Sequence, residues 1–122
     1  MDLSEEDDFD QESVDQKAMN RRAWKLLVEK GYTSDQKTKL DFVFVSEKRA
    51  NAYKLKVLLE AESNYTVKVV NNDDEFEISG QTGELQLSLE ALNQWVAWMV
   101  EEGRKCDCLF DGWTTPRIMK KQ

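Results

Sequence analysis

The order of helical and strand-like segments in this sequence predicts an α+β fold. The segments follow one another as helix, strand, helix, strand, strand, helix, strand. Two β-α-β units joined by a hairpin form a ferredoxin-like plait, in which helices cover one face of a four-stranded antiparallel sheet. A chain of 122 residues is long enough for one such domain with its own core. We therefore expect a plait preceded by one additional N-terminal helix.

The first three elements follow from the apolar pattern and from the residues at their ends. Residues 18–30 show helical spacing of apolar side chains, and Gly31 is suited to end that helix. Residues 40–45 are rich in β-branched and aromatic side chains and predict a strand. Ser46 can then cap a helix that continues to about Glu62.

This second helix carries two apolar stripes. The first consists of Ala50, Tyr53, Val57, Leu58 and Ala61, and the second of Ala52, Leu55 and Leu59. A helix that is apolar on two sides has to bury both of them. We expect it to contact the sheet on one side and the first helix on the other.

The second half of the chain supplies three strands and a helix. Residues 65–70 and 75–81 alternate apolar and polar side chains and predict a hairpin with one wet face. Ser88 is a suitable N-cap for a helix that Gly103 would end. Residues 105–110 predict the final strand.

The acidic charge of the chain is concentrated at its N-terminus. Residues 1–16 contain eight acids and no base, which leaves 16 acidic and 17 basic residues in the remainder, although the net charge is -7. Such a run repels itself and buries little surface. We expect residues 1–16 to be a disordered tail, 17–116 to be a single domain and 117–122 to be a short basic end. The tail would serve either for solubility or for contact with a basic partner segment.

Several function classes are excluded or disfavoured by composition. The chain contains no His and no glycine-rich phosphate loop, so the usual general base and nucleotide sites are missing. Cys106 and Cys108 suit the core better than a disulfide or a zinc site, and they indicate a reducing, cytoplasmic compartment. No apolar run is long enough to cross a membrane, and the acidic N-terminus does not resemble a secretory signal. We expect a protein that is not an enzyme and needs no cofactor or metal.

Direct binding to nucleic acid is not expected either. The strand at 75–81 begins with acids that alternate with apolar residues, whereas sheets that bind RNA present aromatic and basic side chains. An acidic open face would repel phosphates. A protein partner is therefore the better expectation.

Two tryptophans are the candidate binding residues. Trp113 follows Asp111 and Gly112, which we expect to form a tight turn after the last strand. So large a side chain at that position either packs against the fold or binds a partner. Trp98 lies about 120° around its helix from Leu92, the centre of the buried stripe, so it packs under the first helix or faces a partner.

Residues 20–115 resemble a bacterial family, the regulators of ribonuclease E activity of type B (RraB-like). The resemblance depends on Lys30-Gly31-Tyr32 after the first helix, on the order of the elements, and on Phe110-Asp111-Gly112-Trp113-Thr114-Thr115. The closing motif of the family is similar to Tyr-Asp-Gly-Trp-Gly-Thr. Four positions match it (Asp111, Gly112, Trp113 and Thr115), whereas Phe110 and Thr114 differ.

The resemblance implies a non-enzymatic protein that binds ribonuclease E at its scaffold part and modulates RNA decay. The candidate partner-binding residues are then Asp111, Gly112, Trp113 and Trp98. The alternative function is a ferredoxin-like domain that senses a small molecule or dimerises through its open sheet face.

Overall fold

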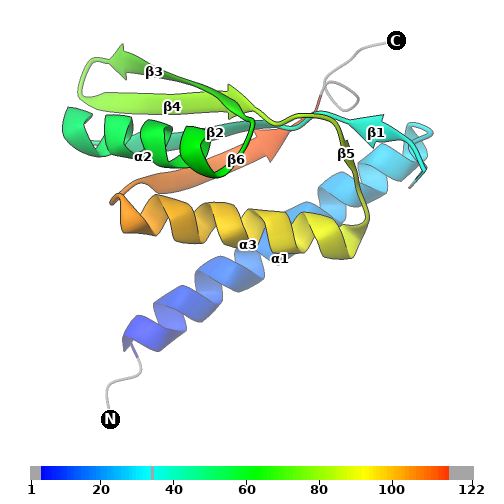
Figure 1. The fold of residues 1–122 in the computed structure, drawn as a ribbon. Helices are drawn as coiled ribbons and strands as arrows, with labels where there is room; N and C mark the ends of the chain where they lie inside the picture. Colours follow the sequence, from blue (N-terminus) through cyan, green and yellow to red (C-terminus); the bar gives the residue numbers. More distant parts are fainter. Residues whose placement is uncertain (1–3, 34, 116–122) are drawn as a thin grey trace.

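The computed structural model describes residues 4–33 and 35–115, with side chains from Gln16 onward (Figure 1). In chain order the elements are α1 (Ser4–Glu29), β1 (Lys37–Thr38), β2 (Asp41–Ser46), α2 (Arg49–Glu62), β3 (Thr66–Asn72), β4 (Glu75–Gln81), β5 (Leu85–Gln86), α3 (Leu89–Lys105) and β6 (Leu109–Thr114). The predicted α+β class, with a helix first, is confirmed.

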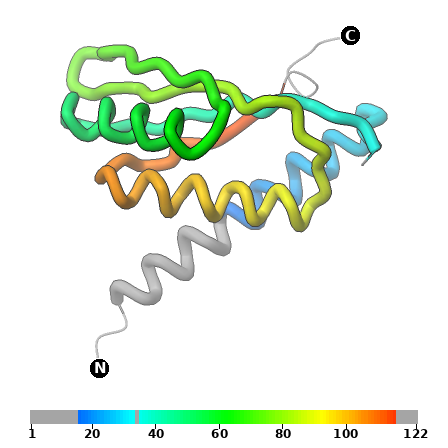
Figure 2. The backbone as a smooth tube through the Cα atoms, viewed as in Figure 1, coloured from blue at the N-terminus to red at the C-terminus, as the bar shows by residue number. Residues whose placement is uncertain are grey.

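Four of the strands form one antiparallel sheet in the order β3-β4-β2-β6. Helix α2 packs on β2, β3 and β4, and α3 packs on β6 and on α2. Helix α1 packs on α3, and Figures 1 and 2 show it crossing behind that helix. The short strands β1 and β5 form a second antiparallel pair that the sequence analysis did not predict.

Aromatic side chains fill the core between the sheet and the two helices. Strand β2 alternates buried and half-buried residues, and Phe42 and Phe44 are both fully buried. The Phe44 ring lies 5.1 Å from Phe110, which is in turn 6.3 Å from Trp95 of α3. The period of two in the sequence therefore does set which face of β2 is covered.

Gly80 allows the close approach of β3 to β4. A Cβ atom at this position would clash with the backbone oxygen of Thr66 and lie 2.7 Å from Cζ of Phe42. The hairpin can pair here only because this residue has no side chain.

The boundaries of α1 and α2 differ from the prediction. Helix α1 begins at Ser4 and not at Ala18, so residues 4–16, which we expected to be disordered, lie in the helix. The helix dipole favours acidic residues in the first turn of a helix, where the sequence has Glu5, Glu6 and Asp7. Helix α2 has Lys48 as its N-cap residue, because Ser46 is the buried last residue of β2 and its Oγ accepts from the N–H of Lys48 (3.3 Å).

The second half of the chain also shows one confirmed cap and one shifted strand. Ser88 caps α3 by accepting from the N–H of Ala91 (3.1 Å), but the helix continues past Gly103 to Lys105. The final strand was predicted at 105–110 and is found at Leu109–Thr114. The chain turns at Asp107, whose φ is 55°, so the buried thiols of Cys106 and Cys108 flank a turn and not a strand pair.

Only one of the two apolar stripes of α2 is buried. Ala52, Leu55 and Leu59 face the core, whereas Tyr53 is 41% exposed and Val57 is 64% exposed. The expected contact between α2 and the first helix is therefore wrong, because α1 packs on α3 instead. Leu58 of the first stripe is half-buried against the core. The other four residues, Ala50, Tyr53, Val57 and Ala61, are exposed, and we call them the outer stripe of α2.

Two structural features are absent from the described part of the chain. None of its helices has the length and apolar character needed to span a membrane. It also contains no group of three or more Cys, Asp or Glu side chains placed to hold a metal ion.

Candidate functional site

The Asp111-Gly112-Trp113 segment lies inside strand β6 and forms a β-bulge. Opposite β2, Val43 pairs with Gly112 and the next residue pairs with Phe110, so Asp111 is the extra residue. Gly112 has φ = 140°, in the region that favours glycine, and a Cβ there would meet no atom within 4 Å. The tight turn expected here is thus a bulge within the sheet, because β6 begins later and ends later than predicted.

Trp113 joins three elements through one polar side chain. Its indole Nε1 donates to Oδ1 of Asn20 in α1 (2.8 Å), and Nδ2 of Asn20 donates to Oδ1 of Asn93 in α3 (2.9 Å). Asn20 is only 1% exposed. A buried amide needs partners, so this relay fixes where α1 sits against α3 and β6. We call it the Asn20 relay.

The end of the motif is held by a second polar contact. The hydroxyls of Thr115 and Thr38 are 2.9 Å apart, and both residues are buried. This contact fixes the end of β6 beside β1. The closing motif of the chain therefore contributes two residues, Trp113 and Thr115, to the packing of the fold.

A groove with a cavity volume of about 310 Å³ lies between α1 and the bulge, and we call it the Trp113 groove. Its lining residues are Met19, Ala23, Asp41, Val43, Asp111, Gly112, Trp113 and Thr114. The apolar part comes from both α1 and the sheet. Met19 is 47% exposed, and its flexible thioether can adapt to an incoming side chain.

Two carboxylates give this groove its charge. Asp41 accepts a hydrogen bond from Nε2 of Gln81 (2.8 Å), which holds its side chain in place at the start of β2. Asp111 is exposed because the bulge turns it out of the sheet pairing. Among the residues that the structure describes, no Lys or Arg lines the groove. The arrangement suits an apolar side chain that has a cationic neighbour.

The four predicted site residues divide between two places. Asp111, Gly112 and Trp113 meet in the groove, whereas Trp98 does not line it. Trp98 is half-buried with its ring 6.3 Å from Tyr65, and Tyr65 also accepts from Nε1 of Trp95 (2.9 Å). Asn93, which faces α1, lies five residues earlier on the helix, about 140° away from Trp98.

Sequence reasoning did not find the α1 side of the groove. Met19 and Ala23 belong to the first helix. They are far from β6 along the chain, and nothing in the local sequence indicates that they contact it. Asn20 was also missed, since a single buried amide in a helix has no distinguishing pattern. The alternation of Asp41 and Val43 with Phe42 would have been a usable signal for the β2 side.

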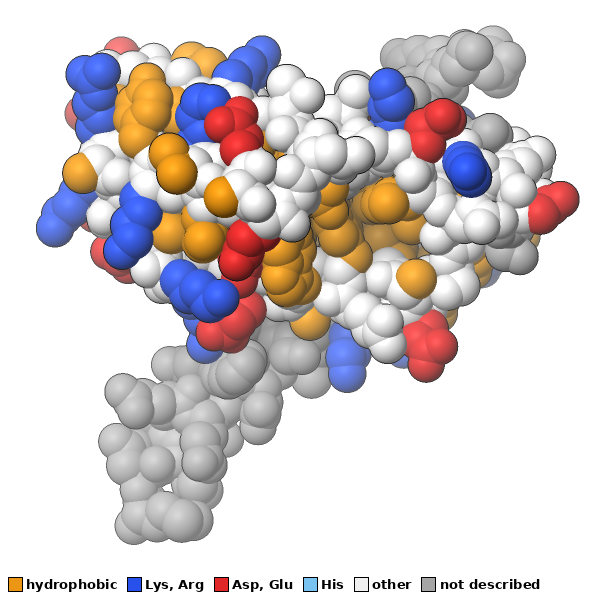
Figure 3. Space-filling model, in the orientation of Figure 1, with side chains coloured by type: hydrophobic (Ala, Val, Ile, Leu, Met, Phe, Trp, Pro, Cys, Tyr) orange, Lys and Arg blue, Asp and Glu red, His pale blue; other side chains and the backbone are white. Residues whose placement is uncertain are grey.

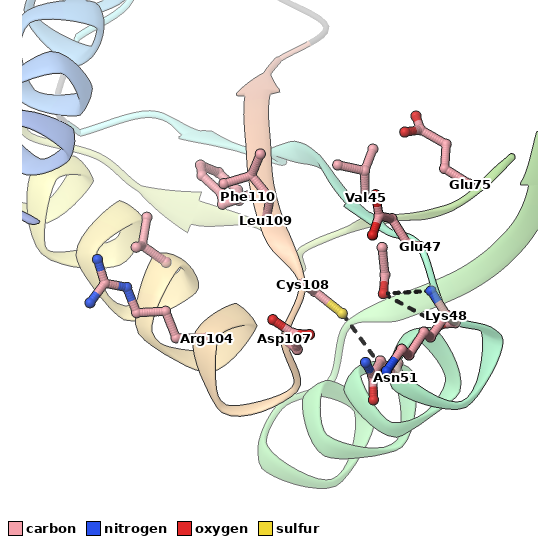
Figure 4. A pocket seen from close by; sticks show the side chains of 12 residues that line it. Val45, Glu47, Lys48, Asn51, Glu75, Arg104, Asp107, Cys108, Leu109 and Phe110 are labelled. Atoms are coloured by element: carbon pink, nitrogen blue, oxygen red, sulfur yellow. Dashed lines mark hydrogen bonds between the residues drawn. The ribbon is translucent and has the colours of Figure 1, made fainter. Parts of the chain in front are cut away.

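A second cavity, of about 520 Å³, lies between the start of α2 and the end of α3 (Figure 4). Its lining combines the acids Glu47, Glu75 and Asp107 with the bases Lys48 and Arg104, so it has no strong charge preference. The remaining lining residues include Cys108, whose pKa is raised to about 11 by burial. A thiol with that pKa stays protonated and is a poor nucleophile at neutral pH.

One buried carboxylate lies outside both cavities. Glu102 is 2% exposed, and its Oε2 accepts from Nζ of Lys105 (2.7 Å). A hydrogen bond with Glu102 raises the pKa of Glu62, and burial adds to that rise. Burial favours the neutral form of Glu102, but hydrogen bonds from Glu62 and Lys105 outweigh it and lower the pKa of this carboxyl. The interaction of these two carboxyls lies where the end of α2 meets the last turns of α3.

The fold and the groove thus define a small α+β protein that has a recess between α1 and β6, in a chain that contains no His. A family model, Regulator of ribonuclease activity B, matches residues 17–115. The chain belongs to this RraB family. The comparison with curated proteins gives no significant match.

Proposed function

We propose that this protein is a non-enzymatic regulator that binds a ribonuclease through the Trp113 groove and modulates RNA decay. Membership of the family supports regulation of ribonuclease activity. The observation that carries the proposal is the groove itself, which exposes apolar surface and two carboxylates beside the closing motif. The partner we propose is ribonuclease E, at its scaffold part, in the cytoplasm. Free thiols at Cys106 and Cys108 agree with a reducing compartment.

The architecture supports the same proposal. We infer that the four-stranded sheet with α2 and α3 is a ferredoxin-like plait, because β2-α2-β3-β4-α3-β6 follow the β-α-β-β-α-β order. Helix α1 and the β1–β5 pair are then additions to the plait. We keep 17–116 as a single domain, with 1–16 and 117–122 as its terminal segments.

The lining of the groove specifies the chemistry of the partner segment. A Leu, Met or aromatic side chain would contact Met19 and Val43 and stack beside Trp113. A Lys or Arg next to that side chain would reach Asp111 or Asp41 at the rim. The partner contact is therefore a short basic and apolar segment, and not a nucleic acid, which two carboxylates would repel.

The test compares two exposed carboxylates by charge reversal. Asp111→Lys should weaken binding to purified ribonuclease E about tenfold or more, which corresponds to about 1.4 kcal/mol. The melting temperature should not change, since Asp111 is exposed and outside the Asn20 relay. Glu84→Lys reverses an exposed charge that does not line the groove, and it should bind like the original chain.

Two outcomes would contradict different parts of the proposal. If the unchanged protein neither binds ribonuclease E nor alters its cleavage of RNA, the partner is wrong. If it binds, and Asp111→Lys and Glu84→Lys bind equally well, the groove is not the contact.

The open sheet face supports the alternative function, a dimerising domain. Leu109 on β6 is 58% exposed and Val70 on β3 is 38% exposed, and their side chains point away from the helices. Leu109→Glu would disrupt a dimer formed through this face. Sedimentation of the two proteins at several concentrations tests it.

A further inference from the structure

The outer stripe of α2 is an apolar surface that no described element covers. It consists of Ala50, Tyr53, Val57 and Ala61, which follow one another at helical spacing. Val57 is the most exposed large apolar side chain among the described residues, at 64%, and Tyr53 is 41% exposed. These residues lie opposite Ala52, Leu55 and Leu59, which pack into the core.

Basic side chains stand on both sides of this stripe. The guanidinium of Arg49 lies 5.4 Å from the centre of the Tyr53 ring, which orients both side chains. Lys54 lies about 60° around the helix from Val57 and is exposed. Lys56 is on the same side of the helix as Arg49. Its Nζ forms an ion pair with Oε2 of Glu60 (2.8 Å), which neutralises its charge. Figure 3 shows Lys and Arg side chains around exposed hydrophobic ones in the part of the surface that contains α2.

The chain itself contains a segment of complementary chemistry. Residues 1–16 carry eight acids and no base, and Phe9 stands between Asp8 and Asp10. An aromatic side chain flanked by acids matches an apolar stripe flanked by bases. The acids of the N-terminal segment would attract the bases beside the stripe, and the contact of the aromatic ring with the stripe would fix where the segment binds.

We propose that the N-terminal acidic segment of a second copy of this chain docks on the outer stripe of α2. Phe9 of one molecule contacts Tyr53 and Val57 of the other, and the neighbouring aspartates face Arg49 and Lys54. The same molecule cannot supply the segment while α1 is one continuous helix from Ser4 that packs on α3 and not on α2. The result is a weak, salt-sensitive self-association.

The first experiment measures association of the full chain by sedimentation. At an ionic strength of about 0.01 M, where screening extends to about 30 Å, the mean mass should rise with protein concentration. At about 1 M, where screening acts within about 3 Å, the dissociation constant should increase at least tenfold. A chain that stays monomeric at low salt up to about 1 mM would overturn the proposal.

Matched double variants separate this surface from general charge effects. Arg49→Glu with Lys54→Glu should abolish association at low salt. Lys37→Glu with Lys39→Glu changes the net charge equally at two exposed positions, in β1 and just after it, and this variant should retain association. If both double variants associate equally, or both lose association, the α2 stripe is not the docking surface.

A third variant distinguishes this dimer from one formed through the open sheet face. Phe9→Ser should weaken association about tenfold or more, whereas Leu109→Glu should leave it unchanged. The opposite result, loss with Leu109→Glu and none with Phe9→Ser, would assign any dimer to the sheet face and overturn the proposal.

Discussion

Replacing Trp113 by Phe tests the Asn20 relay. The substitution keeps an aromatic ring against α1 but removes the indole N–H that donates to Oδ1 of Asn20 (2.8 Å). Asn20 is 1% exposed, so water cannot replace the lost donor without rearrangement. A buried oxygen left without a partner costs about 1–3 kcal/mol. We therefore expect the free energy of unfolding to fall by about 2 kcal/mol.

The assay is urea denaturation followed by far-UV circular dichroism on a double-mutant cycle. Asn20→Ala alone should also destabilise the protein, since it breaks the bonds to both Trp113 and Asn93. In the Asn20→Ala background, Trp113→Phe leaves no buried oxygen without a donor, so it should lower the free energy of unfolding by less than it does in the original chain. The cycle should give a coupling energy of about 1 kcal/mol.

Trp98→Phe is the matched control for ring size. Trp98 is also half-buried, and the structure gives it a ring contact with Tyr65. If Trp113→Phe costs no more than Trp98→Phe, or if the cycle is additive within about 0.5 kcal/mol, the relay does not hold α1 in place.

The remaining predictions concern two glycines, a carboxyl pair and a thiol. Gly112→Ala should cost about 1–3 kcal/mol in a thermal melt, because φ = 140° is strained for alanine although its Cβ meets no atom. Gly80→Ala should destabilise the protein more than Gly112→Ala does and should speed hydrogen exchange in the β3–β4 hairpin. Equal destabilisation by the two substitutions would refute the clash of a Cβ at position 80 with Thr66 and Phe42. Glu102→Gln should lower the pKa of Glu62 in a carbon NMR titration, since the hydrogen bond that raises it is with Glu102. A raised carboxyl pKa stabilises the fold at low pH, and this contribution disappears as the pH rises through the folded pKa, so it should be smaller in the variant. The thiol of Cys108, with its pKa of about 11, should react with iodoacetamide at about pH 8 no faster than the protein opens, and rapid labelling would contradict its burial.

The sequence predicted the elements whose apolar period is unambiguous. Strand β2 alternates cleanly, and α3 carries a strong apolar stripe behind a serine cap, so both were found within a few residues. The last strand was misplaced because Cys106 and Cys108 are apolar at strand spacing, whereas the chain turns between them at Asp107. Local pattern cannot reveal a residue with positive φ that is not glycine.

The candidate site was predicted only in part for a different reason. The motif at Asp111, Gly112 and Trp113 was visible as a motif, but its surroundings depend on tertiary contacts. Met19 reaches the groove because Asn20, the next residue, is held between β6 and α3. No local property of either residue indicates that contact.

The Asn20 relay has a thermodynamic consequence for any ligand of the Trp113 groove. Trp113 is at once a wall of the groove and the donor that attaches α1, so the groove exists only while α1 is attached. A ligand present at 100 times its dissociation constant would therefore suppress detachment of α1 by about 2.7 kcal/mol. Hydrogen exchange of the α1 amides can then report whether the Trp113 groove is occupied. By the same linkage, any substitution that favours detachment of α1 lowers the affinity for the ligand, even where the substituted residue does not contact it.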